Sequence, residues 1–216
     1  MIKKICRFIS VTYDYLFLNK KEKVYKYLLR KGIDTQKSFV NIIGSPPPII
    51  IKHPKSVIKI ENNVTLLSGS ENNYAGVNHC VVLSTINNNA MIIIGEGTGI
   101  SGASISCASN IIIGRDVAIG ANVCIYDHDF HPINPYLRKY HNDNNIKTKP
   151  IIIEDSVWIG ANSMILKGVH IGKGAVIGAN SVVSSDVPDL CVYAGNPAKF
   201  IKKIEMSDAE YNALFK

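Results

Sequence analysis

The fold is decided by residues 151–183, which read IIIEDSVWIGANSMILKGVHIGKGAVIGANSVV. From Ile153 onward an aliphatic residue recurs at every sixth position, and the residue four places after each one is small or β-branched. The aliphatic positions are Ile153, Ile159, Ile165, Ile171, Ile177 and Val183, and the second positions are Val157, Ser163, Val169, Ala175, Ser181 and Val187. A period of six matches neither the 3.6-residue period of a helix nor the alternation of a hairpin. It is typical of a solenoid of short strands and tight turns.

The same pattern continues toward the N-terminus. It fits Ile94, Ile100, Ile113, Ile119 and Ile125, with one extra residue between Ile100 and Ile113, and Ile60 and Leu66 extend it weakly. If each coil has three sides with one inward aliphatic residue per side, stacked coils share a continuous apolar core. The sequence therefore predicts an all-β solenoid, a parallel β-helix of triangular coils. Spacing alone does not give its hand.

The segments outside the solenoid differ in composition. Residues 1–33 interleave apolar residues with lysines and end at Gly32, which favours a basic helical N-terminal segment within 1–45. The prolines of GSPPPIII stop any helix and mark the boundary, so we expect the β-helix domain over 46–198. In the tail, 199–216, Ser207 and Glu210 form a capping box that predicts a short C-terminal helix.

Length and composition narrow the class of protein. The 216 residues suit one domain with a terminal appendage. No apolar run approaches the roughly 18 residues of a membrane-spanning helix. The first residues carry no small-residue cleavage site, so we expect no secretory signal. The five cysteines lack CxxC spacing, which favours reduced thiols in a cytoplasmic protein; they are Cys6, Cys80, Cys107, Cys124 and Cys191.

The positive charge is concentrated at the N-terminus. Residues 1–37 contain ten Lys or Arg against three acidic residues, and ten minus three equals the net +7 of the whole chain. Because the remainder is neutral overall, the charge does not argue for nucleic-acid binding. Two interpretations stay open: the segment lies at an anionic membrane surface, or it packs on the solenoid and caps its open end with the lysines toward solvent.

The stretch YDHDFHP, residues 126–132, interrupts the repeat. The next aliphatic residue is due six places after Ile125, but His131 stands there, and a polar insertion follows over 132–150. Long insertions in a compact domain are usually functional or disordered. A histidine at the root of a loop on a rigid scaffold is a candidate general base. The alternative is that the histidines cap strand ends and that Asp127 and Asp129 are ordinary turn residues.

An ordered combination of motifs resembles the hexapeptide-repeat acyltransferases. The matching stretches are GISGASI, DFHPINP, the insertion, VWIGANS and YAGNPAKFIKKI, between about residues 78 and 203. The likeness is closest to sugar O-acetyltransferases of the maltose and galactoside type and of bacterial capsule and O-antigen pathways. The resemblance implies a left-handed β-helix, a homotrimer, and acetyl coenzyme A lying between neighbouring solenoids. It implies no metal.

The resemblance also assigns roles to individual residues. His131 matches the base that takes the proton from an acceptor hydroxyl, and Trp158 matches the tryptophan beside this histidine and the pantetheine arm. We expect Asp127 or Asp129 to orient the imidazole. The coenzyme-side matches are Ala161, Ala179, Ser184, Ser185, Lys199 and Lys202. Relatives place arginines where Lys199 and Lys202 stand, and lysine lacks the bidentate fork of arginine. The alternative for both is a solvated surface charge.

The acceptor side is less well defined. Asn78 and Ser101 lie where relatives contact the acceptor or orient the histidine. Relatives that acetylate maltose or galactosides carry a short N-terminal domain whose signature is absent here. We therefore expect a polysaccharide or lipid-linked glycan acceptor, and a cytoplasmic enzyme that is either free or peripheral at the inner face of the membrane.

Other functions remain open. An antibiotic-modifying acetyltransferase and an amino-sugar N-acetyltransferase share the fold. So do zinc carbonic anhydrases, for which His79, His128 and His131 could supply ligands. The long polar loop and the VWIG and AGNPAK motifs argue against a hydratase. A non-catalytic scaffold is the remaining alternative, and the pairing of His131 with Trp158 argues against it.

Overall fold

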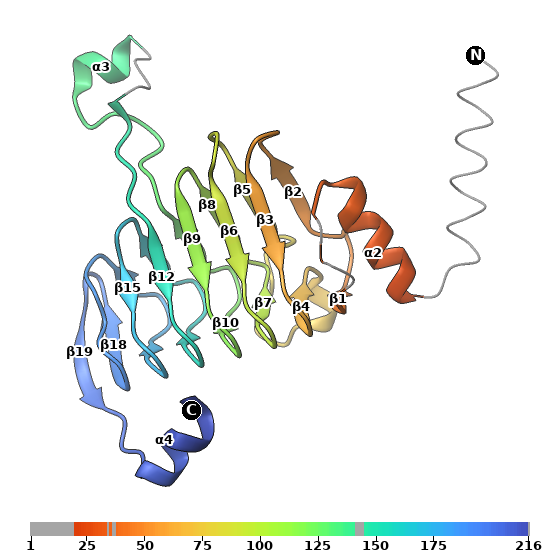
Figure 1. Cartoon of the computed structure of the whole chain (residues 1–216). Coiled ribbons are helices and arrows are strands. Elements are labelled where there is room, and N and C mark those ends of the chain that lie inside the picture. The colour runs from red at the N-terminus through yellow and green to blue at the C-terminus, as the bar shows by residue number, and fades with distance from the viewer. Residues whose placement is uncertain (1–19, 34, 36–37, 141–144, 216) are drawn as a thin grey trace, which may run out of the picture.

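A computed structural model describes residues 20–33, 35, 38–140 and 145–215. The chain forms a solenoid in which three sheets of mainly parallel strands make the sides of a triangular prism (Figure 1). Sheet A contains, in spatial order, β1 (Val40–Ile43), β4 (Val64–Leu67), β7 (Gly99–Ser101), β10 (Ala118–Ile119), β13 (Trp158–Ile159), β16 (Val176–Ile177), β18 (Cys191–Gly195) and β19 (Ala198–Lys203). Sheet B contains β17 (Val182–Val183), β14 (Met164–Leu166), β11 (Cys124–Tyr126), β8 (Ser104–Cys107), β5 (Val82–Thr85) and β2 (Ile49–Lys52). Sheet C contains β15 (His170–Ile171), β12 (Ile151–Ile153), β9 (Asn110–Ile113), β6 (Met91–Ile94) and β3 (Val57–Ile60).

The six-residue pattern sets the register of the coils. Ile159 pairs with Ile119 and Ile177, Ile165 with Ile125 and Val183, and Ile153 with Ile113 and Ile171. Every aliphatic position of the repeat between Ile94 and Val183 is at most 2% exposed. The second positions are equally buried. The sequence prediction of stacked coils with one continuous apolar core is therefore confirmed.

Helices lie outside the prism. α2 (Lys20–Arg30) packs on β1, its Leu28 is fully buried, and the Tyr27 hydroxyl donates to the carbonyl oxygen of Pro48. The helix ends as predicted at Gly32, which has a positive φ of 76°. With 11 residues α2 is the longest helix of the described chain, too short to cross a membrane. α2 thus packs against the first coil, and the choice between the packing and the membrane interpretation stays a prediction; residues 1–19 lie outside the described residues.

The domain limits can be compared with the strands. β1 already pairs in parallel with β4, so sheet A begins ahead of residue 46. At the other end, β19 turns back antiparallel to β18, and α4 (Asp208–Phe215) follows. The Ser207 amide donates to Glu210 Oε2 at 2.8 Å and the Glu210 amide to Ser207 Oγ at 3.3 Å, which confirms the capping box. A one-turn helix, η1 (Ser70–Asn72), lies in the segment between β4 and β5.

Candidate active site

A groove of about 530 Å³ runs along the outer face of sheet A. Its floor is lined by small residues from neighbouring coils, Gly99 of β7, Ala118 of β10 and Gly120 just after it. Trp158 of β13 pairs with Ala118 and forms one wall, with 57% of its surface exposed. The tryptophan therefore points outward from the solenoid. Ser101 lines the same groove.

The corner between sheets A and B repeats the tripeptide Gly-Ala-Asn, at 120–122, 160–162 and 178–180. The asparagines Asn122, Asn162 and Asn180 have φ between 58° and 60°, the left-handed conformation that asparagine tolerates. Each turn lies directly on the next: a Cβ on Gly120 would stand 2.8 Å from the Ala161 nitrogen. A Cβ on Gly160 would stand 2.5 Å from the nitrogen of Ala179.

These turns leave two backbone donors free. Within the described residues, the amides of Ala161 and Ala179 donate to no group of the chain. Ala161 is half-buried and Ala179 is exposed, at equivalent places one coil apart. Two free N–H groups in a row beside a groove can donate hydrogen bonds to a carbonyl oxygen or to the acceptors of a linear polar chain. This is what the coenzyme-side prediction for both residues requires.

Asn122 joins the two residues predicted on the acceptor side. Its Oδ1 accepts from the backbone N–H of Asn78 at 2.8 Å, and its backbone N–H donates to the carbonyl oxygen of Ser101 at 3.1 Å. The loop that carries Asn78 lies against Gly102, where a Cβ would stand 2.1 Å from Val77 Cγ1. The structure therefore brings Asn78 and Ser101 to one corner, at the edge of the groove.

The insertion leaves the solenoid at the corner between sheets B and C. It leaves as a two-stranded stem: the Asp129 amide donates to the Lys147 carbonyl oxygen, and the Lys149 amide to the Asp127 carbonyl oxygen, both at 2.9 Å. Its far end holds α3 (Pro135–Lys139), whose first turn is capped by Asn134 Oδ1. Figure 1 shows this loop standing away from the coils. The one-turn helix was not foreseen from the polar sequence.

His131 is exposed at the root of this loop. In the described part of the chain its imidazole has no hydrogen-bond or ion-pair partner, so both ring nitrogens are open to a substrate. The corner between sheets B and C is opposite sheet A in the triangle, which separates His131 from the groove of its own chain.

The two aspartates near His131 have other partners. Asp127 is fully buried and accepts from the amides of Ala108 and Ser109, both at 2.7 Å. Asp129 Oδ1 is 2.5 Å from Lys167 Nζ. Within the described residues neither carboxylate bonds to His131, so neither is a direct partner of its imidazole in this structure.

The other predicted coenzyme contacts lie at the C-terminal end. Ser184 and Ser185 are exposed directly after β17 in sheet B, and Lys199 and Lys202 are exposed on β19 in sheet A. The serines therefore occupy a different side of the prism from Ala161 and Ala179. The two lysines continue sheet A beyond Trp158.

The histidines do not form a metal site within the described chain. His128 is buried, with 1% of its side chain exposed, and its Nδ1 is 3.1 Å from Asp127 Oδ1. His79 Nδ1 is 2.8 Å from the carbonyl oxygen of Cys80. Among the described residues no three His, Cys, Asp or Glu side chains are close enough to hold an ion.

Comparison with known proteins identifies the family. Residues 150–185 match the family described as bacterial transferase hexapeptide (six repeats). The chain is also 44% identical over 100 residues to a galactoside O-acetyltransferase of Lactococcus lactis, which is 46% of each protein. The chain belongs to the hexapeptide-repeat acyltransferase family. Its solenoid is a left-handed parallel β-helix, as the resemblance implied. The chain spans about half the length of the curated relatives it matches.

Two solved structures of the family resemble the chain along most of its length. A hexapeptide-repeat acetyltransferase of Vibrio cholerae in complex with acetyl coenzyme A is 27% identical, with a TM-score of 0.54 over 88% of this chain and 80% of that one. A galactoside acetyltransferase in complex with coenzyme A is 25% identical, with a TM-score of 0.52 over 94% and 82%.

Three residues of the candidate site were missed in the sequence. Asn122 could have been found, because the tripeptide Gly-Ala-Asn occurs three times at the same place in the repeat. Lys167, the partner of Asp129, carries no sequence signal, since the two are 38 positions apart. Asp116, whose side chain lines the groove, occupies a turn position where aspartate is common.

Proposed function

We propose that the chain is an acetyl-coenzyme-A-dependent O-acetyltransferase that modifies a hydroxyl of a sugar or surface glycan, with His131 as general base. The observation that carries the proposal is the row formed by the groove, Trp158 and the free amides of Ala161 and Ala179. It offers an apolar wall for a pantetheine arm and donors for a thioester carbonyl. The galactoside acetyltransferase named above, whose structure contains coenzyme A, supports the choice of cosubstrate.

The chemistry needs one base and one oxyanion donor. Acetyl coenzyme A supplies an activated acetyl group, whose C–S bond breaks as the acceptor C–O bond forms. His131 takes the proton from the acceptor hydroxyl and returns it to the leaving sulfur. A neutral imidazole suits this role near pH 7, and general-base help is typically worth about 10²–10⁴ in rate. The Ala161 amide is placed to donate to the carbonyl oxygen as it gains charge.

The active enzyme is a homotrimer in this proposal. One chain carries His131 at the corner opposite its own sheet A, whereas the groove and Trp158 lie on sheet A. A neighbouring copy must therefore bring its loop to the groove. Mixing two inactive variants, His131→Ala and Trp158→Ala, tests this directly. Sites shared between copies predict recovery of part of the wild-type activity after subunit exchange, whereas a site within one chain predicts none.

The acceptor lies in the hollow of the groove above Gly99 and Ala118. The small size of these two residues leaves room for a ring, with the Ser101 hydroxyl at one end and the Asp116 carboxylate at the other. Both groups accept hydrogen bonds from sugar hydroxyls. Asp116 also favours a protonated amine, which makes an amino-sugar N-acetyltransferase the second candidate.

Acetyl transfer to a defined panel of acceptors tests the proposal. Radiolabelled acetyl coenzyme A is offered with neutral oligosaccharides, amino sugars, an acidic polysialic acid, a lipid-linked glycan and chloramphenicol. We expect label on a neutral or lipid-linked glycan, in an alkali-labile ester. Label in an alkali-stable amide supports the second candidate instead. Label on chloramphenicol alone contradicts both.

A further inference from the structure

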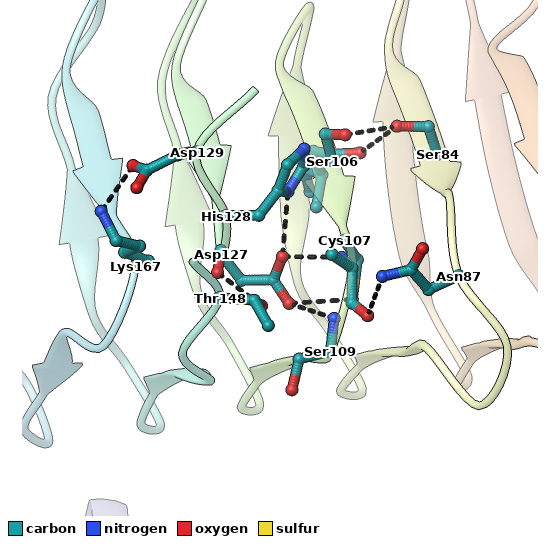
Figure 2. A network of polar contacts seen from close by, with 12 residues as sticks. Ser84, Asn87, Ser106, Cys107, Ser109, Asp127, His128, Asp129, Thr148 and Lys167 are labelled. Atoms are coloured by element: carbon teal, nitrogen blue, oxygen red, sulfur yellow. Dashed lines mark hydrogen bonds and ion pairs between the residues drawn. The ribbon is translucent and has the colours of Figure 1, made fainter. Parts of the chain in front are cut away.

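The Asp127 carboxylate is the centre of a buried cluster at the corner between sheets B and C (Figure 2). Its Oδ1 accepts from the Ala108 amide and its Oδ2 from the Ser109 amide, both at 2.7 Å. The Cys107 thiol donates to Oδ2 at 3.4 Å, and His128 Nδ1 lies 3.1 Å from Oδ1. We call Asp127 with these four partners, Cys107, Ala108, Ser109 and His128, the Asp127 clasp.

The clasp exists because one corner of the coil is wide. Ile105 and Ile113 lie in register with Ile165 and Ile171 of a later coil, but the first two are eight positions apart and the second two are six. The two additional residues leave amides without a strand partner, and an unpaired buried amide is costly. The carboxylate of the next coil supplies the missing acceptors. Burial, and then the nearby carboxylate, raise the pKa of the Cys107 thiol to about 12, so the thiol stays a donor.

The clasp also holds the stem of the loop. The backbone carbonyl oxygen of Asp127 accepts from the Lys149 amide and from the Thr148 hydroxyl, both at 2.9 Å. The outgoing and returning strands of the stem are thus joined at the one residue whose side chain is anchored in the preceding coil. His131 follows four positions later and has no anchor of its own within the described chain.

We propose that Asp127 is a positioning residue, which sets where His131 stands by fixing the root of its loop. The proposal rests on the acetyl transfer proposed above. Asp127 itself is fully buried and touches neither the acceptor nor the thioester. Asparagine cannot replace it, because each carboxylate oxygen accepts from a backbone N–H and the amide nitrogen would face one of these donors.

The kinetic test is Asp127→Asn in the full chain. A base displaced by about 1 Å costs on the order of 10²-fold in rate, so we expect kcat to fall about 10- to 100-fold. KM for acetyl coenzyme A and the dissociation constant of coenzyme A should stay within about twofold, because the groove lies on another sheet. Trp158, the one tryptophan of the chain, reports that binding by fluorescence. A kcat near the wild-type value, or loss of coenzyme binding in step with kcat, overturns the proposal.

Asp189→Ala is the matched control, because asparagine at this position would keep the one oxygen that accepts here. Asp189 Oδ1 accepts from the Lys173 amide at 3.0 Å, so it also ties one coil to another, but at a different corner and away from the loop. We expect it to lower the melting temperature with little change in kcat. An equal fall of kcat in this variant would mean that loss of any corner aspartate suffices, and would contradict a specific role of Asp127.

Hydrogen exchange separates the clasp from the proposed reaction. Without substrate, Asp127→Asn should increase exchange at the amides of Ala108, Ser109 and Lys149, with the rest of the solenoid still protected. If the stem amides stay protected in Asp127→Asn, the proposal that Asp127 fixes the loop root is wrong, whether or not the wild type transfers acetyl groups. If the wild type transfers no acetyl group, the proposed function is wrong instead. If Asp127→Asn does not fold, Thr148→Val removes one stem bond and should lower kcat by a smaller factor with unchanged coenzyme binding; an unchanged kcat contradicts the proposal.

Discussion

Gly120→Ala tests the coenzyme side of the site through the backbone alone. The new Cβ would stand 2.8 Å from the Ala161 nitrogen and 2.8 Å from the Ile159 carbonyl oxygen. Ordinary contacts of a carbon atom lie at about 3.5–4 Å, so the next turn must move by roughly 0.7–1.2 Å. Such overpacking typically costs about 1–3 kcal/mol. For a chain of this size that lowers Tm by about 2–12 °C.

The displaced group is the free Ala161 amide, so binding should suffer together with stability. We expect KM for acetyl coenzyme A to rise and kcat/KM to fall tenfold or more, on the order of the 10²-fold that a 1 Å error costs. Thioester consumption and a thermal melt measure both effects. Gly99→Ala is the matched control for Tm and coenzyme binding, because a Cβ there meets nothing within 4 Å. A Gly120→Ala enzyme with the wild-type KM for acetyl coenzyme A would refute the assignment of this amide.

Three further predictions concern charges. Burial alone would raise the pKa of the Asp155 carboxyl, but hydrogen bonds from the Arg115 amide and guanidinium outweigh it and lower the pKa below the usual 3.8. The ionised Asp155 carboxylate therefore stabilises the folded state above about pH 4, and this stabilisation is lost as the pH falls through the lowered pKa. Asp155→Asn should lower Tm at pH 7, and the difference in Tm from the wild type should vanish in acid melts. Lys199→Ala and Lys202→Ala should each raise KM for acetyl coenzyme A a few-fold, most at low salt. Lys55→Ala, at the far end of the solenoid, should leave this KM unchanged. Equal effects of all three substitutions on KM would mean that Lys199 and Lys202 are only surface charges. The full chain should sediment with anionic liposomes at low salt and a chain lacking residues 1–37 should not; a full-length protein that ignores the liposomes leaves this segment a purely structural role.

The solenoid could be predicted because its cause is local and repeated. An inward aliphatic residue at every sixth position fixes both the strand and its register, so positions such as Ile159 and Ile177 could be placed from spacing alone. Trp158 could be placed outward because it precedes the inward Ile159. Where the rhythm stops, as at α3, spacing carries no information about local structure.

The environment of the candidate base could not be predicted in the same way. Asp127 and Asp129 stand two residues apart in one short stretch, but their partners come from other coils, the Ala108 and Ser109 amides for one and Lys167 for the other. Which coil supplies a partner depends on how each corner is built, and the repeat does not encode this. The sequence indicated that carboxylates matter near His131, whereas the structure shows the Asp127 side chain bonded to the preceding coil and its carbonyl oxygen bonded to Thr148 and Lys149.

The turnover of His131→Ala tests the central claim most directly. The side chain is exposed and has no partner within the described residues, so its removal should leave Tm and the coenzyme-dependent fluorescence of Trp158 unchanged. The account predicts a fall in kcat of about 10²–10⁴ with a wild-type KM for acetyl coenzyme A. A variant that folds, binds coenzyme A and retains most of its turnover would contradict the assignment of His131 as the base.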